Sequence, residues 1–188
     1  MRVVGGQFKK LKLNMVDSKK TRPTTDKVKE SLFNILMPYL TNGEVLDLYA
    51  GSGALGIEAV SRGYSHAYLV DLAKPAIETI QKNVDATHSP ESFSIIKSTA
   101  AQAIERLKKD YVKLDLVLLD PPYAKQQIIK DIAALLENNL LSDDSIIVAE
   151  TDEHGFNSVN QNYDKEHFEV VTTRNFSISY ITVFRRIK

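Results

Sequence analysis

Residues 44–56 read EVLDLYAGSGALG, and this stretch decides the fold class of the chain. Its first part, Val45 to Tyr49, is a short apolar run typical of a buried strand. Glycines follow, and then apolar residues at helical spacing from Leu55 to Val60. Strand, glycine loop and helix form the first half of a nucleotide-binding βαβ unit. The glycines let the backbone approach a ligand closely, and the helix N-terminus directs free N–H groups towards it.

The spacing of the glycines leaves two classes of ligand open. Gly51, Gly53 and Gly56 match the dinucleotide fingerprint, and Asp71 lies 20 positions after Gly51, where that fingerprint has a ribose-binding acid. Asp47, at the strand end, argues against a dinucleotide because its carboxylate would repel a pyrophosphate. The same carboxylate suits S-adenosylmethionine (SAM), which carries an ammonium, a sulfonium and a ribose. A plain tight turn without a ligand is the remaining alternative.

Residues 114–123 read LDLVLLDPPY and form the second decisive stretch. Here too an apolar run ends in a polar segment, and ligands of open α/β sheets bind beyond the carboxyl ends of the strands. Two prolines remove two backbone donors, so the segment presents carbonyl acceptors beside the carboxylate of Asp120. Tyr123 adds an aromatic face. This combination predicts a pocket for a planar exocyclic amino group, such as that of a flipped-out nucleobase.

Four motifs, in their order along the chain, resemble one known protein family. They are residues 2–6 (RVVGG), 21–36 (TRPTTDKVKESLFNIL), 47–56 (DLYAGSGALG) and 120–123 (DPPY). Together they resemble the RsmD-type family, the bacterial 16S rRNA guanine-N2 methyltransferases. Asp-Pro-Pro-Tyr alone also occurs in other amino-methyltransferases. The combination with Thr-Arg-Pro-Thr and the Gly-Gly start is specific, and the match covers nearly the whole chain.

The resemblance implies methyl transfer from SAM to the exocyclic N2 amine of a guanine in small-subunit rRNA. The implied catalytic residues are Asp120, Pro121, Pro122 and Tyr123. The implied cofactor-binding residues are Asp47, Ala50, Gly51, Ser52, Gly53, Asp71, Leu72, Thr99, Ala100 and Asp120. The family usually has Asp-Ala where this chain has Thr99-Ala100. The adenine amine would therefore meet a hydroxyl, a weaker acceptor than a carboxylate.

The N-terminal arm concentrates positive charge, although the whole chain has a formal net charge of zero. Residues 1–30 hold nine basic and three acidic side chains, a balance typical of a phosphate-contacting surface. We therefore predict one domain in which residues 1–40 recognise RNA and residues 41–188 form the SAM-binding catalytic core. The predicted RNA-binding residues are Arg2, Lys9, Lys10, Lys12, Arg22, Thr24 and Lys27. A solvated arm, with Thr24 or Thr25 acting only as a helix cap, is the alternative.

The amino-acid composition excludes several other classes of site and protein. The chain has no cysteine, which excludes disulfides, thiolate zinc sites and cysteine nucleophiles. Its four histidines lack metal-ligand spacing, so we predict no metal site. No apolar run approaches the length of a membrane span, and the first residues lack a signal-peptide core. We expect a cytoplasmic monomer whose partner is rRNA within an assembling or assembled small ribosomal subunit.

The expected fold is the Rossmann-like α/β fold of SAM-dependent methyltransferases, with a mostly parallel sheet of about seven strands and helices on both faces. A small extension, with a hairpin over residues 2–13 and a helix over residues 25–40, precedes it. Lys27 and Lys29 are expected on or beside the polar face of that helix. Residues 168–184 predict a closing antiparallel hairpin.

Two segments near the C-terminus complete the predicted organisation. Residues 152–164 are polar and predict a loop. Glu150 ends a strand predicted over residues 145–149, and we interpret it as a surface acid rather than a site acid.

Three other functions stay open on the sequence. A DNA adenine-N6 methyltransferase shares Asp-Pro-Pro-Tyr, but it usually needs a separate sequence-reading domain, for which 188 residues leave little room. A protein amide methyltransferase has Asn where this chain has Asp120. A non-catalytic RNA-binding assembly factor would have no need of an intact set of site acids and glycines, and a SAM-binding test discriminates it.

Overall fold

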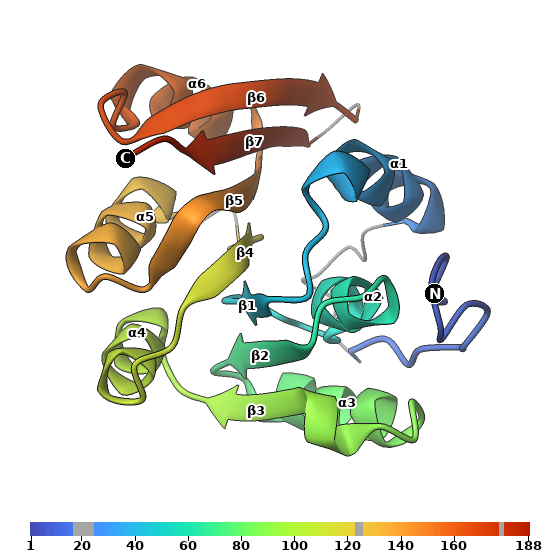
Figure 1. Cartoon of the computed structure of the whole chain (residues 1–188). Helices are drawn as coiled ribbons and strands as arrows, with labels where there is room; N and C mark the ends of the chain where they lie inside the picture. Colours follow the sequence, from blue (N-terminus) through green and yellow to red (C-terminus); the bar gives the residue numbers. More distant parts are fainter. Residues whose placement is uncertain (17–24, 123–125, 177–178) are drawn as a thin grey trace.

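A seven-stranded sheet in the order β3-β2-β1-β4-β5-β7-β6 forms the centre of the molecule (Figure 1). The computed structural model describes residues 1–16, 25–122, 126–176 and 179–188. The strands are β1 (Glu44–Asp47), β2 (His66–Asp71), β3 (Phe93–Lys97), β4 (Leu114–Leu119), β5 (Leu141–Thr151), β6 (Phe168–Asn175) and β7 (Tyr180–Arg186). Strands β3, β2, β1, β4 and β5 are parallel, and β7 runs antiparallel between β5 and β6. The predicted Rossmann-like sheet and its closing hairpin are confirmed.

Helices cover both faces of this sheet (Figure 1). One face carries α1 (Asp26–Leu36), α2 (Ala54–Ser61) and α3 (Lys74–Asp85), and the other carries α4 (Ala100–Lys109), α5 (Ile128–Glu137) and α6 (Glu153–Asn162). Two short 3₁₀ turns, η1 (Met37–Tyr39) and η2 (Pro90–Ser92), complete the described elements. Because each strand alternates its side chains between the two faces, the buried apolar residues separate into two clusters, one per face.

The chain reverses its direction of travel across the sheet between β1 and β4. From β1 it proceeds outwards to β2 and β3, and it then returns to place β4 on the other side of β1. This arrangement creates a topological switch point, where ligands of open α/β sheets bind beyond the carboxyl ends of the strands. Both motif-bearing loops, after Asp47 and after Leu119, leave the sheet at that point.

Gly56 allows α2 to pack closely against the sheet. A Cβ atom at this position would lie 2.3 Å from Cδ2 of Leu69, a buried side chain of β2. Replacing Gly56 with alanine should therefore lower the free energy of unfolding by about 1–3 kcal/mol through overpacking. Urea denaturation measures this loss.

Gly51→Ala is the matched control for Gly56→Ala. A Cβ atom at Gly51 would meet nothing within 4 Å, although its φ of +55° disfavours a side chain. Strain of about 1–2 kcal/mol is expected there, without a packing defect. Wild-type stability in Gly56→Ala would contradict the packing role.

The N-terminal hairpin is reduced to a single bridge between Arg2 and Lys12, so the prediction of two paired strands is wrong. The chain does double back, since Val3 N–H donates to the Leu11 carbonyl at 2.9 Å. A longer ladder does not form because the N–H groups of Val4 and Gly5 donate instead to a side chain of α2.

The polar segment after β5 is a helix, so the predicted loop is wrong. Asp152 caps α6 by accepting a hydrogen bond from Gly155 N–H at 2.8 Å. Phe156 stacks on Tyr180 of β7, and Val159 is buried in the second core cluster. The segment has few apolar residues, but their helical spacing is enough to cover the end of the sheet. Strand β5 itself extends beyond the predicted residues 145–149 at both ends.

The first helix begins as expected and ends earlier. Thr25 caps α1, because its hydroxyl accepts a hydrogen bond from Val28 N–H at 3.3 Å. The helix stops at Leu36 and continues as the 3₁₀ turn around Pro38. Lys29 is fully buried, so its expected position on or beside the polar face is wrong.

In the part of the chain that the structure describes, the helices are too short or too polar for any of them to cross a bilayer.

Candidate functional site

Four carboxylates lie side by side at the carboxyl ends of neighbouring parallel strands. In sheet order they are Asp71 at the end of β2, Asp47 at the end of β1, and Asp120 and Glu150 at the ends of β4 and β5. Two positions before each carboxylate is a buried apolar residue on the face that α1–α3 cover. These residues are Leu69, Val45, Leu118 and Val148. Side chains two positions apart on a strand share a face, so all four carboxylates are on this one. We call them the strand-end acid row.

Asp47 is almost completely buried, with 2% of its surface exposed. Its Oδ2 accepts a hydrogen bond from Gly56 N–H in the first turn of α2 at 3.0 Å. Burial raises the pKa of Asp47 to about 7; the nearby Asp71 adds to this, while the Gly56 hydrogen bond acts in the opposite direction. A positive ligand charge close by would favour the ionised form.

Asp120 and Glu150 directly follow Leu119 and Ala149, which are register partners on β4 and β5. Burial, and next the charges of Glu150 and Asp47, raise the pKa of Asp120 well above its ordinary value. Burial also raises the pKa of Glu150, against a smaller opposite effect of its hydrogen bond with Ser179. Glu150 is thus half-buried next to Asp120, which does not match its interpretation as a surface acid, and a role at the site is a proposal.

The glycine loop is tied to the end of β2. Asp71 Oδ2 accepts from Gly51 N–H at 2.9 Å, and Asp71 Oδ1 accepts from Ala73 N–H at 2.8 Å. Gly53 is in the left-handed conformation, with a φ of +78°, and it begins α2. The spacing of 20 residues between glycine loop and acid therefore corresponds to direct contact between the two.

The remaining predicted cofactor-binding residues lie at the same edge of the sheet or next to it. Leu72 follows Asp71 and is 61% exposed, which is unusual for a large apolar side chain. Ala50 is buried in the glycine loop, and Ser52 is half-buried. Thr99 caps α4, and its hydroxyl accepts from Gln102 N–H at 3.3 Å in a capping box. The adenine contact of Thr99 stays a prediction.

These features fit SAM. Among the described residues, no basic side chain forms an ion pair with any member of the strand-end acid row. Burial and mutual repulsion raise the pKa values of Asp47, Asp120 and Glu150, so a positively charged cofactor beside the glycine loop would supply the countercharge that favours their ionised forms.

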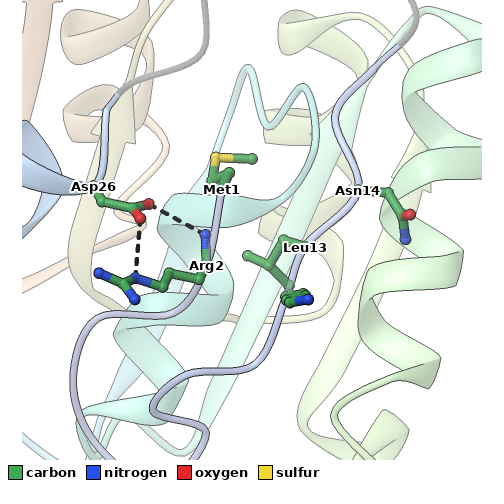
Figure 2. A pocket seen from close by; sticks show the side chains of 6 residues that line it. Met1, Arg2, Leu13, Asn14 and Asp26 are labelled. Atoms are coloured by element: carbon green, nitrogen blue, oxygen red, sulfur yellow. Dashed lines mark hydrogen bonds and ion pairs between the residues drawn. The ribbon is translucent and has the colours of Figure 1, made fainter.

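The predicted RNA-binding residues are at the surface where the structure describes them. Arg2, Lys9, Lys10, Lys12 and Lys27 are all exposed. Figure 2 shows a hollow in this arm, where Arg2 pairs with Asp26 at 3.2 Å and Asn14 stands at the opposite rim. Arg22, Thr24 and the predicted catalytic Tyr123 lie outside the described residues. Pro121 is buried and Pro122 is exposed beside Asp120.

Sequence reasoning missed the buried ion pair that holds the arm to α2. Lys29 and Glu58 are both fully buried, with Lys29 Nζ 3.4 Å from Glu58 Oε2. The two Glu58 oxygens also accept from Val4 N–H at 2.9 Å and Gly5 N–H at 2.8 Å. The available signal was the helical spacing of Lys29 with Leu32 and other inward-facing residues of α1.

Comparisons with known proteins agree with the motifs and the fold. A sequence model of the family described as "Conserved hypothetical protein 95" matches residues 1–185. A Bacillus subtilis protein named provisionally as the rRNA methyltransferase YlbH is 41% identical over 81% of this chain and 83% of its own length. Ribosomal RNA small subunit methyltransferase D of Escherichia coli K12 is 34% identical over 87% of this chain and 81% of its own length.

Solved structures show the same architecture. The Escherichia coli protein YhhF, described provisionally as a methyltransferase, superposes with a TM-score of 0.84 at 27% identity, over 100% of this chain and 98% of that one. The seven-stranded sheet is thus the sheet of known methyltransferase structures. The chain belongs to the family described as conserved hypothetical protein 95, the RsmD-type methyltransferase family that its motifs resemble.

Proposed function

We propose that this protein is a SAM-dependent methyltransferase that modifies the exocyclic N2 amine of one guanine in small-subunit rRNA. The observation that carries the proposal is the pair of carboxylates formed by Asp120 and Glu150 at the ends of neighbouring strands. Family membership and the names of the relatives support the reaction class and the rRNA substrate.

The pair of carboxylates favours guanine over adenine on chemical grounds. The Watson–Crick edge of guanine carries two adjacent donors, N1–H and the N2 amino group. Two neighbouring carboxylates match those donors. Adenine offers its amino group beside N1, which is an acceptor, so adenine would match this pair only with one carboxyl protonated. Family membership and the names of the relatives make a DNA adenine methyltransferase the weaker candidate.

The residues of the site would position the amine rather than activate it through a covalent intermediate. SAM supplies an electrophilic methyl group on its sulfonium. Asp120 and the Pro121 carbonyl would accept hydrogen bonds from the guanine amino group, and they orient its lone pair towards the methyl group. Tyr123 is proposed to stack on the base. Asp47 would face the positive charges of the cofactor, and Asp71 at the end of β2 would accept from its ribose.

We propose that the chain is a single methyltransferase domain, in which residues 1–40 recognise RNA and residues 41–188 form the catalytic core. Exposed lysines of the arm would contact phosphates, so binding should weaken steeply with salt. The rRNA would be presented within an assembling or assembled small subunit in the cytoplasm, and the protein would act as a monomer.

Transfer of a labelled methyl group tests the proposal. SAM carrying the label is incubated with small ribosomal subunits that lack the modification, and in parallel with naked rRNA and duplex DNA. Label is expected in N2-methylguanine of the small-subunit rRNA. Label in DNA adenine would instead support the alternative enzyme, and SAM binding without any transfer would mean that the substrate is a different one. A non-catalytic assembly factor would give neither SAM binding nor methyl transfer.

Substituting Glu150 with glutamine tests the guanine argument. The glutamine amide can offer a donor where the carboxylate offered only acceptors, so one contact with the guanine edge is lost. We expect kcat/KM to fall by a factor equivalent to about 1–3 kcal/mol, with little change in SAM affinity. The inhibition constants of guanosine monophosphate and adenosine monophosphate measure the same contact directly. The preference of the enzyme for guanosine monophosphate should be smaller in Glu150→Gln than in the wild type. An unchanged preference would contradict the role of Glu150.

Binding of SAM should depend on pH because of Asp47. Burial raises the pKa of this carboxyl to about 7 in the free protein, whereas the cofactor's positive charges favour the ionised form. Below that pKa a proton must be released on binding, so SAM should bind about tenfold more weakly at pH 6 than at pH 8. Titration calorimetry in two buffers measures both the affinity and the proton release.

In the free protein, Asp47 makes the folding stability fall as the pH rises, whereas it makes SAM affinity rise. Its folded pKa lies above the unfolded value, so stability from the protonated carboxyl is present at low pH and is lost as the pH rises through about 7. SAM should consequently raise the melting temperature more at pH 8 than at pH 6. Asp47→Asn should abolish this contribution, and equal shifts at both pH values in the wild type would contradict it.

A further inference from the structure

One buried amide connects the cofactor loop to the N-terminal arm. Asn83 lies in α3 and is fully buried. Its Oδ1 accepts from the backbone N–H of Asn14 at 2.7 Å and from Asn14 Nδ2 at 3.0 Å. Its Nδ2 donates to the Asn14 carbonyl at 3.0 Å and to the Ser52 carbonyl at 2.8 Å. Every donor and acceptor of this side chain is therefore used.

The two partners of Asn83 belong to different parts of the proposed site. Ser52 is in the glycine loop, between Gly51 and Gly53, where the cofactor is proposed to bind. Asn14 follows the bridge between Arg2 and Lys12 and leads towards the Thr-Arg-Pro-Thr segment. These partners are 38 residues apart in sequence, yet a single amide group fixes both.

Other contacts hold the arm to α2, at Val4 to Phe8 and at Lys29. Ser61 of α2 accepts from Phe8 N–H through its hydroxyl at 2.9 Å, and its carbonyl accepts from Gln7 N–H at 2.8 Å. None of these reaches the glycine loop. Among the described residues, Asn83 is the side chain that hydrogen-bonds both to Asn14 of the arm and to Ser52 of the loop.

We propose that Asn83 is a positioning residue that couples occupation of the cofactor loop to the placement of the N-terminal arm on rRNA. The proposal rests on the proposed function. The Asn83 amide makes one hydrogen bond to the Ser52 carbonyl and three to Asn14. Because the amide group is planar and rigid, a shift of the Ser52 carbonyl that the amide follows also changes its bonds to Asn14. Cofactor binding therefore favours one arrangement of the arm, and by linkage rRNA binding favours the occupied loop.

The test compares the affinity for unmodified small subunits with and without S-adenosylhomocysteine (SAH), the unreactive product, at one salt concentration. We expect SAH to raise the affinity of the wild type at least about fivefold, which is the lower end of ordinary coupling between sites. Asn83→Ala should reduce this change to less than about twofold while SAH still binds to the free protein. A wild-type affinity that SAH leaves unchanged, or full coupling in Asn83→Ala, would overturn the inference.

Asn14→Ala is the matched control. It removes only the contact from Asn14 Nδ2, since the two backbone bonds of Asn14 and the Ser52 bond remain. This variant should keep most of the coupling. Hydrogen exchange gives a readout that does not require a folded Asn83 variant. In the wild type, SAH should slow exchange of the Asn14 amide, and an unchanged rate would overturn the inference.

The outcomes separate this inference from the proposed function. If the wild type methylates small subunits but shows no coupling, only the role of Asn83 fails. If it neither binds nor methylates small subunits, the proposed function fails first.

Discussion

Replacing Asp120 with alanine is expected to lower kcat for methyl transfer by about 10²–10⁴-fold, which is the usual contribution of a positioned acid–base or hydrogen-bonding group. The amine nitrogen of guanine is a poor nucleophile because its lone pair is delocalised into the ring. Asp120 would orient that lone pair, and alanine offers no acceptor in its place. Single-turnover kinetics with labelled SAM and unmodified small subunits measure the chemical step directly.

The location of Asp120 predicts that affinity will change less than rate. Its carboxyl sits at the switch point between Asp47 and Glu150, and the charges of both raise its pKa. Removing it relieves repulsion within the strand-end acid row, so SAM affinity should stay within a few fold of the wild type. A variant with unchanged kcat would contradict the proposed role of Asp120.

Asp115→Asn is the matched control, because Asp115 lies on the same strand as the residues that lead to Asp120, but near its opposite end. Its Oδ2 accepts from Glu44 N–H at 3.0 Å, far from the carboxyl edge of the sheet, and an asparagine oxygen can keep this bond. Methyl transfer by Asp115→Asn should match the wild type. A large loss in this variant would mean that substitutions on β4 act through the fold rather than through the site.

The sequence was sufficient to predict the sheet because its strands are short apolar runs that end in polar or glycine-rich loops. Val45 to Tyr49 and Leu114 to Leu119 are of this kind, and the structure places their ends together at the switch point. The spacing from Gly51 to Asp71 predicted a ribose-binding acid; the structure places Asp71 beside the glycine loop, and its contact with a ribose stays a prediction. Strands and glycine loops can be predicted in this way because a few residues that are adjacent in sequence determine their backbone geometry.

The errors arose where tertiary packing outweighs local composition. A polar segment became α6 because Phe156 and Val159, at helical spacing, pack against the end of the sheet. The half-burial of Glu150 beside Asp120 was missed because its sequence neighbours do not reveal that β5 pairs with β4. Lys29 was assigned to a polar face because a lysine is rarely buried without a partner, and its partner Glu58 is 29 positions away.

Replacing Glu58 with alanine is expected to lower the free energy of unfolding by about 3–5 kcal/mol, the usual cost of leaving a buried charge without its partner. The Lys29 ammonium would keep one acceptor, the Arg2 carbonyl at 2.6 Å, but it would lose the only carboxylate within its reach among the described residues. Val4 and Gly5 would also lose the acceptor of their N–H groups, and Arg62 its ion pair at 2.8 Å. Urea denaturation measures the loss.

The exposed pair of Lys74 and Glu78 provides the control, since it has the same charges at 3.7 Å but both side chains are mostly exposed. Glu78→Ala should change stability by less than about 1 kcal/mol. In the Glu58→Ala background, Lys29→Met should restore part of the loss, because it removes the uncompensated charge and keeps an unbranched chain in the core. Absence of any recovery would mean that the cost lies in the backbone bonds of the arm. A loss below about 1 kcal/mol in Glu58→Ala would contradict the stabilising role of the Lys29–Glu58 ion pair.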